Sequence, residues 1–293
     1  MKMKIDKVIF STSVEYSSFW NIQSQVFKEA LGIEPVCLLY GKKSDTTMHE
    51  KYGQVIEREF DESLPEVIQI TWSKFDFPKT EEETTWMIGD IDMVPLNKQY
   101  FVDNIAEYEE NAYLHLNFAG ISKPRRGILD AFLREGSEAH ARAAGSKGTG
   151  ADLAGHYHVS KGKNFIRCFD LDRTINEQIS FITESHKYGL GVAMGSEKLQ
   201  PNPNSYYWCA EESYSSERIF DMIREQKLNF NGVCYDNVRQ RVDRSTWNES
   251  TLDYKYSPDL LKQKQIVDIH CQRPYEKQEA AMMRVIELSG ILG

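Results

Sequence analysis

Residues 86–97 read WMIGDIDMVPLN and are the best guide to the architecture of this chain. The apolar residues at the start of this run predict a buried strand that ends at Asp90, and Pro95 then stops the run. Asp92 follows Asp90 at a spacing of i, i+2. Open α/β sheets bind their ligands in the crevice beyond the carboxyl ends of the strands. The run therefore predicts an α/β protein with a place for a metal ion and a phosphate group.

A second Asp-x-Asp triplet, formed by Asp170 and Asp172, has a structural interpretation. It follows the apolar segment 165–169, which we interpret as a strand, and Arg173 comes directly after it. An arginine at that spacing can pair with a carboxylate, so a capped or salt-bridged strand end accounts for the triplet.

The beginning of the chain predicts a β–α–β unit. A strand at 7–10 is followed by a segment whose apolar residues keep helical spacing up to Gly32, and then by a strand at 36–40. Such a crossover joins parallel strands and is right-handed. The predicted fold class is therefore α/β, with a Rossmann-like, mostly parallel mixed central sheet flanked by helices. Further elements are expected as a helix at 64–75, a helix through 100–105 and a strand at 114–118.

The composition fits one large α/β domain or two small ones. The chain has 293 residues, of which 41% are hydrophobic and 12% aromatic, enough for a sizeable core. Its formal net charge of -9 opposes binding to the phosphates of nucleic acids, and the short basic group at 123–126 is too small to override that field. We therefore expect no nucleic-acid partner.

The cysteines and the first residues predict the cellular location. The 5 cysteines are scattered and form no Cys-x-x-Cys pair, which argues against a disulfide framework and against a zinc ribbon. The first residues show no pattern of a secretory signal, and no stretch approaches the length of apolar sequence that spans a membrane. We expect a soluble, cytoplasmic protein without a transmembrane segment.

Adjacent carboxylates at Glu211 and Glu212 follow an aromatic cluster that includes Trp208. Two carboxylates near buried aromatic rings should differ in pKa, which would suit one of them to accept a proton. The same pair could instead begin a helix, because acidic residues are favoured in a first turn. Both interpretations stay open on the sequence.

A strand pattern at 266–275 finishes with His270 and Arg273 before a proline. A single histidine is as often a structural residue as a ligand. If His270 reaches Asp92, the set becomes two carboxylates and one imidazole. Such a mixed oxygen and nitrogen site suits Mn²⁺ or Mg²⁺, with a substrate diphosphate supplying the remaining ligands.

These residues carry a resemblance to a known family. Residues 90–97 resemble the DxDxxPxN segment of metal-dependent glycosyltransferases of the GT-A fold, most closely the β-1,4-galactosyltransferase type. The resemblance implies a single GT-A-like domain over 1–293, with 1–97 as the nucleotide-sugar-binding half and 98–293 as the acceptor-binding half. It also implies that Asp90 and Asp92 hold Mn²⁺ and the diphosphate of a nucleotide sugar, with a UDP-sugar favoured, in a hexosyltransferase of carbohydrate biosynthesis.

The resemblance extends to the segment 203–212, which is similar to the family's Pro-Asn-x-x-Trp-x-x-Glu-Asp motif. It implies that Glu212 is the catalytic base, that Glu211 contacts the acceptor, that Trp208 helps to bind it, and that His270 is the third metal ligand. The chain departs from the motif at Cys209 and Ala210, where the family has glycines, and at Glu212, where it has aspartate. Inverting transfer is weakly favoured, and retaining transfer stays open because retaining GT-A enzymes also pair an Asp-x-Asp with a late histidine.

Other candidate site residues follow from their places along the chain. The base and ribose of the nucleotide would be lined by residues that follow the first strand, namely Ser11, Thr12, Ser13 and Tyr16. Three residues could border the diphosphate or the acceptor, namely His156, His158 and Lys161, although two histidines at i, i+2 can equally form one face of an exposed strand. Arg273 would neutralise charge on the departing diphosphate.

Two other functional classes stay open. Residues 90–94 also fit the DxDx[TV] motif of haloacid-dehalogenase-type phosphatases, in which Asp90 would attack phosphorus. In that family, however, the motif follows a first strand near the amino terminus, whereas a complete β–α–β unit precedes it here. The third class is a non-catalytic carbohydrate-binding protein, in which the aromatic residues would stack on sugars.

Overall fold

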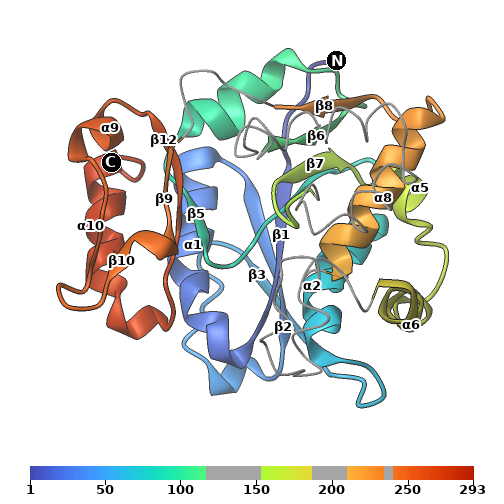
Figure 1. Ribbon diagram of the computed structural model, residues 1–293, viewed down its shortest axis with the longest axis horizontal. Helices are drawn as coiled ribbons and strands as arrows, with labels where there is room; N and C mark the ends of the chain where they lie inside the picture. Colours follow the sequence, from blue (N-terminus) through green and yellow to red (C-terminus); the bar gives the residue numbers. More distant parts are fainter. Residues whose placement is uncertain (117–152, 187–209, 234–239) are drawn as a thin grey trace, which may run out of the picture. The chain divides into compact units, whose positions relative to one another are not determined.

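The computed structural model describes residues 1–116, 153–186, 210–233 and 240–293 (Figure 1). Its contacts divide the chain into two compact units, each assembled from separate segments. Unit 1 contains Met1–Glu59, Gly89–Glu109 and Tyr235–Gly293, and unit 2 contains Phe60–Ile88 and Glu110–Cys234. Both units combine strands with helices, so the predicted α/β class is confirmed. The predicted division into a nucleotide-sugar-binding half (1–97) and an acceptor-binding half (98–293) stays a prediction.

Unit 1 opens with three parallel strands, β1 (Lys7–Ser13), β2 (Glu34–Tyr40) and β3 (Gln54–Arg58). β2 pairs with β1 on one side and β3 on the other, with Ile9 opposite Val36 (Figure 1). The interiors of β1 and β2 are buried at consecutive positions, as expected for parallel strands that are covered on both faces. The two strands predicted from the first 40 residues are therefore confirmed.

The connection from β1 to β2 is helical, as the apolar spacing predicts. It consists of a 3₁₀-helix η1 (Val14–Phe19), an α-helix α1 (Trp20–Gln25) and a π-helical turn η2 (Val26–Leu31). Gly32 ends it in the left-handed conformation, with φ 70°, which glycine adopts without the steric cost of a Cβ.

A second, three-stranded sheet in unit 1 brings distant segments together. Its central strand is β12 (Ile266–His270), which runs antiparallel to β5 (Met93–Pro95) and parallel to β9 (Gln240–Val242) (Figure 1). His270 lies opposite Met93 in this register. The pairing therefore places the end of β12 beside the aspartate run.

Apart from the last helix, which has 11 residues, the remaining elements of unit 1 are short. The helix predicted through 100–105 is present as two short turns that follow each other. The elements are η3 (Lys43–Asp45), η5 (Gln99–Asp103), η6 (Asn104–Glu107), η8 (Arg244–Thr246), β10 (Trp247–Asn248), β11 (Asp253–Tyr254), α9 (Pro258–Lys262), η9 (Tyr275–Lys277) and α10 (Glu279–Ser289).

The described residues of unit 2 form a mixed set of four strands. β7 (His158–Lys161) runs antiparallel to β4 (Thr85–Ile88) and to β6 (Tyr113–His115), and β6 runs parallel to β8 (Phe230–Gly232). The helical elements are α2 (Glu66–Asp76), η4 (Phe77–Thr80), α5 (Gly162–Phe169), α6 (Ile175–His186) and α8 (Ala210–Arg224). Trp72 of α2 anchors the core: its ring stacks on Phe75, with centroids 5.3 Å apart, and its indole N–H donates to Gln178 at 2.7 Å.

One predicted strand is wrong. The segment 165–169 belongs to the helix α5, because Phe165, Cys168 and Phe169 recur at i, i+3 and i+4 and are all fully buried on one helical face. The structural interpretation of the second Asp-x-Asp triplet fits nevertheless. Asp170 ends α5 in the left-handed conformation and pairs with Arg173 at 3.4 Å.

Two strand boundaries also differ from the prediction. β4 ends at Ile88, two residues before Asp90, and β6 begins at Tyr113. In the described residues we find no helix of the length and apolar character that crossing a membrane requires.

Candidate functional site

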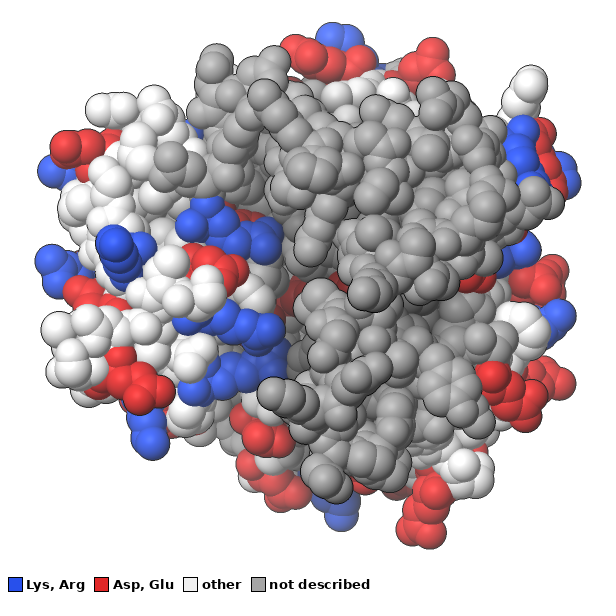
Figure 2. Space-filling model, viewed as in Figure 1, with Lys and Arg blue, Asp and Glu red and all other residues white. Residues whose placement is uncertain are grey.

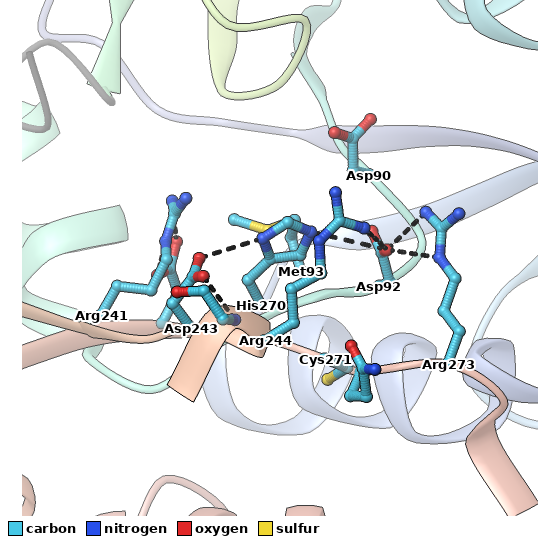
Figure 3. Close-up of polar contacts among 12 residues, drawn as sticks. Asp90, Asp92, Met93, Arg241, Asp243, Arg244, His270, Cys271 and Arg273 are labelled. Carbon is cyan, nitrogen blue, oxygen red and sulfur yellow. Dashed lines mark hydrogen bonds and ion pairs between the residues drawn. The ribbon is translucent and has the colours of Figure 1, made fainter. Parts of the chain in front are cut away.

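Asp92 is the centre of a cluster of charged side chains in unit 1 (Figure 3). Its backbone carbonyl accepts a hydrogen bond from the Cys271 N–H at 2.8 Å, which ties the aspartate run to the end of β12. Its buried carboxylate accepts two hydrogen bonds from Arg273, at 3.0 Å from Nε and 2.6 Å from Nη2, both on Oδ2. Asp92 is therefore held from the backbone and from the side chain.

Gly89 lets the chain pass close to β1 just before the aspartates. Its N–H donates to the Ile9 carbonyl at 2.9 Å, and a Cβ at this position would lie 2.8 Å from Cδ1 of the buried Phe10 ring. This close approach requires a glycine. The contact with β1 fixes the position of the backbone directly before Asp90.

The imidazole of His270 lies between two carboxylates. Its Nε2 is 3.7 Å from Oδ2 of Asp92, and its Nδ1 is 3.2 Å from Oδ2 of Asp243 (Figure 3). His270 is the last residue of β12, so the antiparallel pairing with β5 brings it to Asp92 from the other end of the chain.

Asp90 is placed differently from Asp92. Its side chain points away from the Asp92 cluster in Figure 3, while its backbone carbonyl accepts from Gln23 at 3.0 Å. In the described parts of the chain, no group of three or more potential ligands is arranged to hold a metal ion. Of the three predicted metal ligands, the structure brings Asp92 and His270 together.

The charges of the cluster shift one another's pKa. Burial raises the pKa of Asp92, but the contact with His270 and the Arg273 charge outweigh it and leave that pKa below its usual value. Burial opposes the charging of His270, yet its hydrogen bond to Asp243 and its contact with the Asp92 carboxylate raise its pKa. The carboxylate of Asp92 is therefore charged at neutral pH.

Tyr16, one of the four residues predicted to line the nucleotide, contacts the Asp92 cluster through Arg273. The guanidinium carbon of Arg273 lies 4.3 Å from the centre of the Tyr16 ring, a cation–π contact. Thr12 is buried within β1 and donates to the Ser13 carbonyl at 3.1 Å, and Ser11 is nearly as buried. An aromatic ring beside the arginine is suited to pack against a base.

Three residues of the cluster were not predicted, and all come from the end of β9 and the turn after it. Arg241 makes a bidentate ion pair with Asp268, at 2.6 and 2.8 Å, and Asp243 contacts His270. Arg244 places its Nη1 3.9 Å from Oδ2 of Asp92. Lys and Arg side chains gather over β9 and the elements next to it in the view of Figure 2.

The sequence did contain a signal for these residues. Arg241 and Asp243 are spaced i, i+2, as are Asp268 and His270, so each pair lies on one side of its strand. Once β9 and β12 are known to be neighbours, opposite charges meet across the two strands.

In unit 2, the predicted site residue His158 forms a buried imidazole pair with His115, which was not predicted. The Nε2 atoms of His158 and His115 both approach the carbonyl of Ala154, at 2.7 and 3.2 Å. A carbonyl can only accept, so both rings carry their proton on Nε2, and Nδ1 of His158 accepts from the Tyr113 hydroxyl at 3.0 Å. His158 is fully buried, so it does not form an exposed strand face, and its role beside the diphosphate or the acceptor stays a prediction.

The other predicted residues of unit 2 lie in separate contacts. Lys161 is buried and pairs with Glu110 and Glu83, and His156 packs edge-on against the Tyr157 ring at 4.7 Å. Trp208 lies outside the described residues.

Glu211 and Glu212 stand in the first turn of α8, as the helix-start interpretation predicts. Glu212 accepts a hydrogen bond from the Gly155 N–H at 2.8 Å through Oε1, and Glu211 is 4% exposed. A carboxylate held by a backbone N–H keeps a defined orientation, which a general base also requires.

The imidazole pair predicts a loss of stability in acid. Burial lowers the pKa of His115 to about 3 and places that of His158 well below its ordinary value. Between pH 6.5 and 3 the unfolded chain therefore binds more protons than the folded one, so the free energy of unfolding falls as the pH falls. His115 alone should contribute a loss of about 2 kcal/mol between pH 7 and pH 5.

Urea unfolding at a series of pH values measures this effect. His115→Gln, which does not titrate, should show a smaller fall from pH 7 to pH 5 than the wild type. The matched control is His49→Gln, because His49 is exposed, and this variant should keep the wild-type pH dependence. An unchanged pH dependence in His115→Gln would contradict the prediction.

The likeness of this chain to known proteins is one of structure. No protein-family model and no curated protein matches the sequence. Among solved structures, the chain is similar to the apo structure of WbbM, a bifunctional glycosyltransferase, with a TM-score of 0.46 and 10% sequence identity over 98% of this chain. The chain spans 52% of that protein. At this identity and TM-score, the likeness says nothing about activity.

Proposed function

We propose that this chain is a glycosyltransferase that moves a sugar from a nucleotide-diphosphate donor, with a UDP-sugar favoured, to a hydroxyl acceptor. The observation that carries the proposal is the meeting of His270 and Arg273 with Asp92, to which the β5–β12 pairing brings them. If the aspartate run binds a metal ion and a diphosphate as the motif that it resembles does, a third metal ligand has to lie close to Asp92. The guanidinium, together with a divalent cation held by the carboxylate and the imidazole, would offset the charge of a diphosphate.

The chemistry of the donor atoms fits a divalent cation. Asp243 engages Nδ1 of His270, so Nε2 faces Asp92. Asp92 and His270 would hold Mn²⁺ or Mg²⁺, with Asp90 two residues before, and the diphosphate and water would complete the ligand set. When bound, the cation would supply a Lewis acid that offsets the charge on the diphosphate.

The chain's own residues have separate tasks in this proposal. Arg273 carries a permanent charge, is about one-quarter exposed at 26%, and would stabilise the negative charge that grows on the departing diphosphate. Glu212 would take the proton from the acceptor hydroxyl, a contribution of roughly 10²–10⁴ in rate for a well-placed base. Glu211 would contact the acceptor. The roles of both glutamates rest on the sequence motif.

A thermal-shift panel of nucleotide sugars, each with and without Mn²⁺, tests the proposal. One donor is expected to raise the melting temperature only when Mn²⁺ is present, because a ligand that binds the folded state alone stabilises it, by about 2.7 kcal/mol at 100 times its dissociation constant. The shift should be absent in Asp92→Asn. Binding of free sugars without any nucleotide sugar would favour the carbohydrate-binding class instead.

A generic phosphate ester with Mg²⁺ separates the phosphatase class. Hydrolysis without a sugar acceptor, lost in Asp90→Asn, would replace the proposed function by that of a phosphatase with Asp90 as nucleophile.

A further inference from the structure

We propose that Asp243 is a positioning residue that fixes the ring of His270 so that its Nε2 is directed at Asp92. The inference rests on the proposed function, because it assigns His270 the task of binding a cation through Nε2. Asp243 matches no part of the family motif in the sequence. The structure alone brings it to the site.

Both carboxylate oxygens of Asp243 are engaged. Oδ1 accepts the backbone N–H of Ser245 at 2.8 Å, and Oδ2 lies 3.2 Å from Nδ1 of His270. The side chain is about one-third exposed, at 34%, while that of His270 is 19% exposed. Because one oxygen is tied to the backbone of the same turn, the other is held in a fixed direction toward the ring.

The contact determines the tautomer of the neutral imidazole. Neither of the two ionised carboxylates has a proton to give, and of the two ring nitrogens only Nδ1 lies within hydrogen-bond distance of one, at 3.2 Å from Asp243, so the hydrogen of the neutral ring belongs on Nδ1. Nε2 then presents its lone pair, and this atom lies 3.7 Å from Oδ2 of Asp92. A histidine that binds a metal through one nitrogen commonly donates its other N–H to a carboxylate, which orients the ring and makes the ligand more basic.

Asp243 also places a cation at the same aspartate. It is the N-cap of η8, the turn that begins with Arg244. The Arg244 guanidinium lies 3.9 Å from Oδ2 of Asp92 and is 38% exposed, where an incoming anion could reach it. One carboxylate therefore arranges two of the side chains that face Asp92.

The variant Asp243→Asn reverses this arrangement without changing its shape. The amide has a single oxygen, and the Ser245 N–H requires that oxygen as its acceptor. The amide nitrogen is then left facing Nδ1 of His270, which must accept. The proton of the neutral ring moves to Nε2, and the lone pair no longer faces Asp92.

The experiment combines a spectroscopic and a binding measurement on the full chain. Nitrogen-15 NMR of histidine-labelled protein, at a pH where the His270 ring is neutral and with His270→Gln to assign its signals, should show the Nδ1–H tautomer in the wild type and the Nε2–H tautomer in Asp243→Asn. Titration with Mn²⁺ alone, followed by the electron paramagnetic resonance signal of the free ion, should show roughly 10–100-fold weaker binding in the variant.

The matched control is Asp253→Asn. Asp253 lies in the same unit, accepts a backbone N–H at 2.8 Å and pairs with the exposed Arg284 at 3.2 Å. This variant should keep the wild-type tautomer of His270 and the wild-type affinity for Mn²⁺.

The outcomes separate this inference from the proposed function. An Nε2–H tautomer in the wild type overturns the role of Asp243, whether or not Asp243→Asn folds. A variant that keeps both tautomer and affinity overturns it as well. If the tautomers change as described but the wild type binds no Mn²⁺, Asp243 still positions His270, and the metal dependence of the proposed function fails.

Discussion

Replacing Asp92 by asparagine is expected to lower glycosyl transfer by roughly 10²–10³-fold. The carboxylate of Asp92 is the group that Arg273, Arg244 and His270 all face, at 2.6, 3.9 and 3.7 Å. Without its charge, the proposed cation loses an anionic ligand, and the three basic groups are no longer held around one point. The measurement is the initial rate of transfer from the donor that the thermal-shift panel identifies, at saturating Mn²⁺.

The same substitution should cost a moderate amount of stability. Breaking a buried ion pair by removing one partner costs about 3–5 kcal/mol when the other charge stays buried. Arg273 is 26% exposed and can turn toward water, so a loss nearer about 1–3 kcal/mol is expected. The pKa of Asp92 is lowered by folding, so its contribution to stability is present at neutral pH and is lost as the pH falls through that lowered pKa. Activity must therefore be measured well below the melting temperature of the variant.

Asp76→Asn is the control that separates stability from chemistry. Asp76 is also buried and paired, with Lys79 at 2.6 Å and Gln178 at 2.8 Å, but it belongs to α2 in unit 2, and these two partners lie in the same unit. This variant should lose comparable stability and keep most of its transfer activity. Full activity in Asp92→Asn, or an equal loss of activity in both variants, would contradict the assignment of the site.

The parts of the fold that sequence reasoning predicted are those coded by local patterns. The helical spacing before Gly32 and the apolar runs of β1, β2 and β12 each carry their own period and their own stop signal. The helix α5 was missed because the run at 165–169 is too short for its period to separate a strand from a buried helix. The three buried residues at i, i+3 and i+4 identify a helix only when it is known that all three face the core.

In the candidate site, too, the residues that a local motif marks were predicted and those that depend on strand pairing were not. Asp92, His270 and Arg273 were found because a motif pointed to them, and the structure places them in contact. Asp243 and Arg244 were missed because their importance depends on the pairing of β9 with β12, a register between segments that no local pattern fixes. The buried His115–His158 pair was likewise hidden, since the shared Ala154 carbonyl comes from a third segment.

Replacing Gly162 by alanine is expected to lower the free energy of unfolding by about 3 kcal/mol or more. Gly162 joins β7 to α5, and its N–H donates to the Thr84 carbonyl at 3.1 Å, so the backbone lies against the segment before β4. A Cβ at this position would lie 2.6 Å from the Glu81 carbonyl oxygen and closer still to that of Pro78. Backbone atoms cannot turn aside as a flexible side chain can, so the strand–helix junction or the facing segment must shift.

The sign of this effect makes it diagnostic. In an exposed helix, alanine stabilises by up to about 1 kcal/mol relative to glycine, so without the close approach the substitution would raise stability. The control is Lys163→Ala, one residue along α5, where the side chain is 37% exposed and pairs with the 70% exposed Glu83. An exposed ion pair contributes about 1 kcal/mol or less, so Lys163→Ala should unfold at nearly the wild-type urea concentration. A Gly162→Ala variant as stable as the wild type would contradict the close packing of the start of α5 against residues 78–82. It would also contradict the position of β7, the strand that precedes α5 and contains His158.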